Sequence, residues 1–160
     1  MPKIDLGSVA DSSGCNYPPP FADICLGATW QKLGDAAGLS DFGVNLVRLP
    51  PGAWSSQRHW HTAEEEFVWV LEGEGVLVTN EGEQVLVAGD CAGFPAGEPN
   101  GHHIQNRSDK ELVLLEVGSR REAEDGCDYP DIDLMLKIGD LEYSHKDGTP
   151  YVDTKTARSR

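Results

Sequence analysis

His59-Trp60-His61-Thr62-Ala63-Glu64-Glu65-Glu66 is the stretch of this chain that carries the most information about its fold. Side chains two residues apart on a strand project from the same face, so His59 and His61 can hold two imidazoles side by side. A glutamate that follows after a short loop can reach the same point from the next strand. Two imidazoles and a carboxylate suit a divalent transition metal, although an isolated His-x-His pair more often belongs to a polar loop. The stretch therefore predicts neighbouring strands that share a metal site.

Short strands are predicted on both sides of this stretch. Residues 43–49 form a mixed strand that Pro50-Pro51-Gly52 ends. Further strands are predicted at 67–71, 76–79 and 85–87, from Ile104 onwards, and at 112–117. Strands that recur at about 8–12 residues and are separated by Gly and Asp predict an all-β sandwich or barrel.

A second histidine cluster, His102-His103, can supply a fourth ligand. The spacing around the first cluster is Gly52, six residues, His59-x-His61, four residues, Glu66, six residues and Gly73. The spacing around the second is Gly89, five residues, Pro95-Ala96-Gly97, four residues, His102, three residues and Asn106. The two patterns resemble the two motifs of the cupin family, with one extra residue before the first motif's histidines and two before the second's.

The resemblance implies a single antiparallel jelly-roll β-barrel over residues 42–118 and one bound divalent transition metal, for which Zn, Ni, Mn, Fe and Cu all remain open. Glu66 is favoured over Glu64 and Glu65 because it alone satisfies both spacings of the first motif. His102 is favoured over His103 because its spacing to the following asparagine fits the second. The implied metal ligands are His59, His61, Glu66 and His102.

The whole chain also resembles a group of small single-domain bacterial cupins, notably at residues 35–39, 54–61 and 128–134. Some of these are labelled sugar phosphate isomerase-like, which implies a metalloenzyme acting on a small oxygen-rich metabolite. A non-catalytic small-ligand-binding cupin and a metal-dependent dioxygenase are the alternatives. Proton transfer between carbons needs a titratable group besides the metal ligands, and the candidates are Glu64, Glu65, His103 and a metal-bound water.

Three further polar residues are candidates for substrate binding. Gln57 shares the strand parity of His59, and Asn106 shares that of His102, so both can point towards the metal. Arg48 can anchor an anionic substrate. Each has a structural alternative, which is a loop position for Gln57, a turn for Asn106 and a surface ion pair for Arg48.

Composition narrows the possible partners. The chain has 160 residues, which suits one domain, and a formal net charge of -14. Such a surface repels phosphate backbones and anionic lipid, so we expect a small-molecule partner, and neither nucleic-acid nor membrane binding. No apolar run approaches the ~20 residues that cross a bilayer, and no secretory signal is visible. The four cysteines form no C-x-x-C pair, so we expect reduced thiols and a cytoplasmic protein.

The segments outside the barrel are the reason to expect that the protein forms an oligomer. Residues 1–41 are expected to form an N-terminal arm, and residues 119–160 a C-terminal extension that packs on the barrel and ends in a loose tail at 154–160. Residues 1–25 and 119–150 show no periodic pattern able to form a second core, yet their apolar residues must be buried on this chain or a neighbour. These residues are Tyr17, Phe21, Tyr129, Ile132, Leu134, Leu136, Leu141 and Tyr143. We therefore expect a homodimer, the commonest closed assembly.

Overall fold

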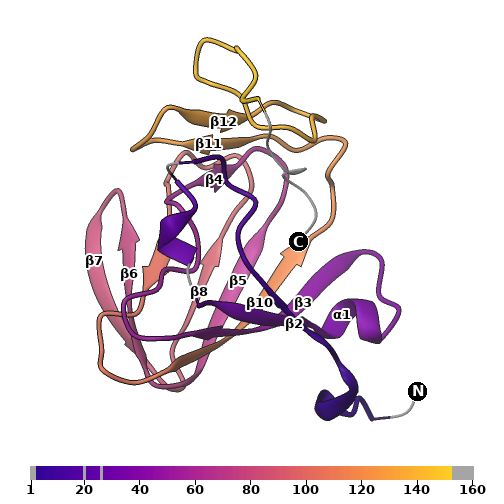
Figure 1. Cartoon of the computed structure of the whole chain (residues 1–160), viewed down its shortest axis with the longest axis vertical. Helices are drawn as coiled ribbons and strands as arrows, with labels where there is room; N and C mark the ends of the chain where they lie inside the picture. The colour runs from indigo at the N-terminus through magenta and orange to yellow at the C-terminus, as the bar shows by residue number, and fades with distance from the viewer. Residues whose placement is uncertain (1–2, 20, 26, 153–160) are drawn as a thin grey trace.

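Strands dominate the computed structural model, which is shown in Figure 1 and describes residues 3–19, 21–25 and 27–152. The predicted tail at 154–160 lies outside these residues. The helical elements are α1 (Leu33–Ala36) and two short 3-10 helices, η1 (Leu6–Ser8) and η2 (Asp23–Cys25). Across the described ranges, no helix has the length and apolar character needed to span a membrane. The strands are β1 (Asp11–Ser13), β2 (Thr29–Lys32), β3 (Phe42–Leu49), β4 (Trp60–His61), β5 (Glu66–Glu72), β6 (Glu74–Thr79), β7 (Gly82–Val87), β8 (Cys91–Phe94), β9 (His103–Gln105), β10 (Leu112–Ser119), β11 (Cys127–Tyr129) and β12 (Leu134–Leu136).

These strands form three antiparallel sheets. The largest has the order β1-β2-β3-β10-β5-β8, the second is β7-β6-β9, and the third is β12-β11-β4. Figure 1 shows the first two sheets enclosing a barrel and the third lying across one end of it. The predicted antiparallel jelly-roll barrel is confirmed.

Alternating burial along the strands fixes which face of each sheet lines the barrel. On β5, Val68 and Val70 are buried, whereas Phe67 and Trp69 are exposed. Inward side chains of the six-stranded sheet and of the β7-β6-β9 sheet meet in one core, since Leu77 of β6 packs in the same cluster as Val68 and Val70. This core occupies one part of the barrel and leaves the end beside β4 for polar side chains.

The turn between β5 and β6 accepts only glycine. Gly73 has a φ of 80°, and a Cβ there would lie 2.6 Å from the backbone oxygen of Glu111. A side chain at this position would therefore be strained by its backbone conformation and would collide with the chain that enters β10. The conformation explains why a glycine follows the strand that begins with Glu66.

One row of polar side chains crosses the inner face of the six-stranded sheet. The register pairs Lys32 with Asn45, Asn45 with Glu116, and Glu116 with Val68. Directly opposed residues of neighbouring strands share a face, and Val68 belongs to the core. Lys32, Asn45 and Glu116 therefore project into the barrel. We call these three residues the polar row.

The terminal segments form a second core, which corrects the expectation that they cannot. Tyr17 packs edge-on against Tyr129, with ring centroids 5.6 Å apart. The buried members of this core are Tyr17, Cys25, Cys127, Tyr129, Leu134, Leu136 and Tyr143. Phe21 and Ile132 are partly buried against it, whereas Leu141 remains 54% exposed. The chain thus buries most of the apolar residues of its arms against itself.

Candidate metal centre

Three histidine side chains converge on one glutamate at the open end of the barrel. The Nε2 atoms of His59 and His61 lie 3.5 and 3.6 Å from Oε2 of Glu66. Nε2 of His102 lies 2.8 Å from the same oxygen. An isolated antiparallel bridge joins the backbones of His59 and His102, so the two motifs meet directly. The structure therefore brings together all four residues that the sequence predicts as ligands.

The second nitrogen of each ring is held by an acceptor. Nδ1 of His59 and Nδ1 of His102 face the backbone carbonyls two residues earlier, at 2.8 and 3.4 Å. Nδ1 of His61 donates to a carboxylate oxygen of Asp125 at 2.7 Å. Because these oxygens only accept, the neutral rings carry their proton on Nδ1 and present a lone pair on Nε2. Three lone pairs facing a carboxylate are stabilised by a cation between them, so the donor set fits a divalent metal.

The pKa shifts of Glu66 and His59 agree with this role. Desolvation raises the pKa of Glu66, but the close contacts of its carboxylate with the His102 and His59 rings outweigh it and hold the pKa well below its usual range. Burial lowers the pKa of His59. Burial also opposes a charge on His61, yet the hydrogen bond to Asp125 raises its pKa overall. The site thus keeps Glu66 anionic and His59 neutral, the forms that bind a metal.

His103 has a different environment from His102. Its Nδ1 donates to the backbone carbonyl of Ser56 at 3.0 Å, and its Nε2 contacts the side-chain amide of Gln105 at 2.9 Å. Its ring packs edge-on against Trp54, and burial lowers its pKa to about 4. The geometry therefore favours His102 as the ligand, as the motif spacing predicts.

A cavity of about 230 Å³ adjoins the four converging side chains. All four line it, together with the complete polar row of Lys32, Asn45 and Glu116. Glu64 also lines it and accepts the backbone N–H of Arg121 at 2.7 Å, whereas Glu65 is exposed and is not among the described lining residues. The cavity thus combines the candidate metal ligands with a carboxylate, Glu116, that is not one of them.

Sequence reasoning did not identify Glu116, although a signal was present. It is the only charged residue of strand β10, and it shares the parity of the buried Leu112 and Leu114. A carboxylate at an inward strand position is costly unless it is paired or functional, so this parity alone could have marked it.

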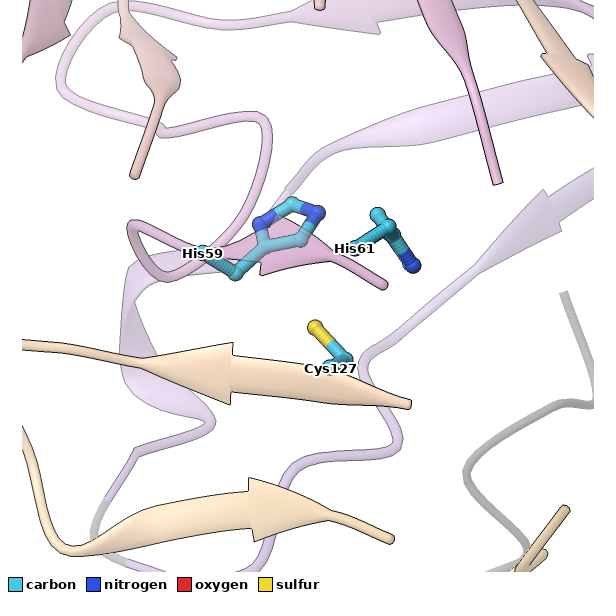
Figure 2. A group of neighbouring side chains, drawn as sticks. All are labelled: His59, His61 and Cys127. Carbon is cyan, nitrogen blue, oxygen red and sulfur yellow. The ribbon is translucent and has the colours of Figure 1, made fainter. Parts of the chain in front are cut away.

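Two further residues next to the site come from the C-terminal extension. Asp125 is fully buried and bonds His61, as described above. Cys127 is 3% exposed, and β11 places it directly opposite His61 of β4. Figure 2 shows its sulfur directed towards the imidazoles of His59 and His61. No pattern in the sequence places residues 125–127 there, because the placement depends on the pairing of β11 with β4.

The three predicted substrate-binding residues are not among the described residues that line the cavity. The Gln57 amide donates to the backbone carbonyl of Phe21 at 2.9 Å. The buried Asn106 amide donates at 2.7 Å to two backbone carbonyls that flank the strand ends. Arg48 forms a surface ion pair with Glu111 at 3.0 Å. Each residue therefore makes a structural contact of the kind that was given above as the alternative to substrate binding.

Comparison with known proteins identifies the family. Residues 45–118 match the Cupin domain. A structure from Silicibacter pomeroyi, named as a sugar phosphate isomerase from the cupin superfamily, is 46% identical and has a TM-score of 0.88, covering 95% of this chain and 98% of that one. This chain belongs to the cupin superfamily. Other proteins match this cupin at lower sequence identity.

Two further relatives differ in name. A structure from Acidithiobacillus ferrooxidans, named as a candidate sugar phosphate isomerase, is 32% identical with a TM-score of 0.69, covering 78% of this cupin and 80% of that chain. The oxalate-binding protein of Thermotoga maritima is 37% identical over 71 residues, which are 44% of this cupin and 56% of that protein. This cupin therefore matches little more than half the length of its curated relative.

Proposed function

We propose that this cupin is a metal-dependent isomerase of a small, hydroxyl-rich metabolite, with a sugar or sugar phosphate as the substrate class. One divalent transition metal would be held by His59, His61, Glu66 and His102. The observation that carries the proposal is the cavity in which these side chains meet a further carboxylate, Glu116. The name of the Silicibacter pomeroyi relative, a sugar phosphate isomerase, supports the same reaction class.

The chemistry divides between the ion and the polar row. A metal held by the four side chains would polarise a hydroxyl or carbonyl oxygen of the substrate. Glu116 would take the proton from the carbon next to the carbonyl and return it to the neighbouring carbon, as aldose–ketose exchange requires. Asn45 is its cross-strand neighbour, and Lys32 is the partner of Asn45 on the next strand; both would orient the substrate hydroxyls by hydrogen bonds.

Proton exchange into the substrate tests this proposal. Pentose and hexose phosphates, and the matching free sugars, are incubated in D₂O with protein loaded in turn with Zn, Ni, Mn, Fe or Cu. Loss of the NMR signal of the hydrogen beside the carbonyl is followed. Glu116→Gln should keep its metal and lose about 10²–10⁴-fold in exchange rate, the usual contribution of a positioned acid or base. His61→Ala should lose most of its metal. Absence of exchange with every metal and sugar contradicts the isomerase proposal.

A non-catalytic binding role is the second candidate, because a curated relative is named an oxalate-binding protein. Oxalate is a small dicarboxylate, and it could bind a metal through two oxygens without any proton transfer. Calorimetric titration of the metal-loaded protein with oxalate separates the two roles. Tight oxalate binding together with no sugar exchange favours the binding module.

We also propose that the protein is a homodimer that pairs through the outer face of its six-stranded sheet. In-register neighbours on this face form apolar rows, one of which joins Leu46, Leu115, Trp69 and Cys91. Trp69 is 45% exposed there. A second copy related by a twofold axis would bury this face against its equivalent.

A further inference from the structure

Cys127 lies where a metal held by the proposed centre could reach it. Strand pairing places Cys127 opposite His61, and Asp125 on the same segment anchors the ring of that histidine. The residue is 3% exposed, and it lines the same cavity as the four proposed ligands. Figure 2 shows the sulfur on the side of β11 that faces the two imidazoles.

Distances place the sulfur within one ligand shell. One ligand atom each from His59, His61 and Cys127 lies within 4.8 Å of the other two. The same criterion groups His59 with Glu66 and His102. With metal–ligand bonds of about 2.0–2.3 Å, ligand atoms on a shared ion lie about 3–4 Å apart, so the sulfur needs to approach by at most about 1–2 Å. Because His59 belongs to both groups, the thiol lies beside the four proposed ligands and does not define a separate site.

A second buried cysteine provides the comparison. Cys25 is 5% exposed and belongs to the same second core as Cys127. Among the described residues, the groups of potential ligands include Cys127 and do not include Cys25. Both cysteines can serve as small apolar side chains in the core. The histidines around Cys127 distinguish it from Cys25.

We propose that Cys127 is a thiolate ligand of the metal, added by the C-terminal extension to the four ligands of the barrel. This inference rests on the metal centre proposed above. When the metal–sulfur bond forms, the thiol S–H bond breaks and its proton passes to solvent. A thiolate is a soft donor, so this fifth ligand strengthens the preference for Zn, Cu and Fe over Mn.

Cobalt(II) is the probe for this ligand because a cobalt–thiolate bond produces a sulfur-to-metal charge-transfer band in the near ultraviolet. The metal-free full-length protein is titrated with Co²⁺, and the d–d bands report binding independently of sulfur. We expect the charge-transfer band in the wild type and in the matched control Cys25→Ser. In Cys127→Ser the band should vanish, and Co²⁺ affinity should fall by about tenfold or more, at least the loss expected from removing an outer partner of a ligand.

The outcomes separate this inference from the metal centre itself. Co²⁺ binding with d–d bands and no charge-transfer band, or a band that persists in Cys127→Ser, overturns the thiolate ligand and leaves the four barrel ligands standing. No Co²⁺ binding by the wild type overturns both. X-ray absorption of the Zn-loaded wild type needs no variant, and a sulfur shell at about 2.3 Å must be present if Cys127 ligates. Its absence refutes the inference even if Cys127→Ser fails to fold.

Discussion

Replacement of Asp125 by asparagine tests how the C-terminal extension controls the metal centre. Asp125 is 0% exposed, and one of its oxygens accepts Nδ1–H of His61 at 2.7 Å. Its other oxygen accepts the backbone N–H groups of Ala63 and Glu64 at 2.9 and 3.2 Å. Asparagine keeps the shape but replaces one acceptor with a donor. If that donor faces His61, it favours the tautomer with the proton on Nε2, which cannot bind a metal. If it faces the backbone, two buried N–H groups lose their acceptor.

Either orientation should weaken metal binding. Loss of an outer-shell partner of a ligating histidine typically costs about 10–100-fold in affinity, or about 1.4–2.8 kcal/mol. Competition for Zn²⁺ between the protein and a chromophoric chelator measures this difference. Asp133→Asn is the matched control, because Asp133 lies in the same extension but pairs with His145 at a side-chain exposure of 60%. Wild-type Zn²⁺ affinity in a natively folded Asp125→Asn variant would show that the carboxylate does not support His61.

Two further predictions concern acid stability and assembly. The pKa of buried His103 is lowered to about 4, below its unfolded value of about 6.5, so from pH 7 to pH 5 the unfolded chain gains a proton that the folded chain does not. Urea titration of the metal-free protein should show that this group lowers the free energy of unfolding by about 2 kcal/mol between pH 7 and pH 5. The free energy of unfolding of His103→Gln should therefore fall correspondingly less over the same range. An equal fall in both proteins contradicts the prediction. The wild type should sediment at twice its chain mass of 17.4 kDa, and Trp69→Glu as a monomer. Val87→Glu, on the exposed face of β7, should remain dimeric, and a monomeric wild type would refute the interface.

Local patterns predicted an all-β sandwich or barrel, and the resemblance to the cupin motifs implied the jelly-roll and the four converging side chains. Strands β3, β5, β6, β7 and β10 alternate or are bounded by glycine and proline, so they were predicted from short-range sequence, whereas β8 was not. The resemblance to the cupin motifs implied that His102 and Glu66 meet, and the structure brings them into contact although they are 36 residues apart. The extra residues before His59 and His102 fall outside the regular strands, so they do not disturb this convergence.

Parity arguments failed where a regular strand was assumed too early. Gln57 was expected to share a face with His59, but residues 55–58 form bends, and β4 begins only at Trp60. Asn106 lies one residue beyond β9, so it follows the geometry of the turn and bonds backbone carbonyls. Strand periodicity carries no information about side chains in such segments.

The second core was unpredictable for a different reason. Its members come from segments far apart in the chain, such as Tyr17 and Tyr143, and neither segment has a period of its own. Their burial depends on the pairing of β11 with β4, a long-range contact without a local signature. Asp125 and Cys127 reach the metal centre through the same pairing, so they were missed together.

The attachment of the C-terminal extension to the metal centre has a consequence for the lifetime of the protein. Asp125 bonds His61, and the N–H of Gly126 donates to the Thr62 hydroxyl at 2.7 Å, so the extension holds the very strand that offers ligands. An ion bound by that strand would in turn stabilise the extension, because a ligand that prefers the closed form shifts the equilibrium towards it. Metal starvation would then loosen residues 119–152 and expose them to proteases. The supply of metal would thereby set how long each copy of the protein survives, and limited proteolysis would measure metal occupancy.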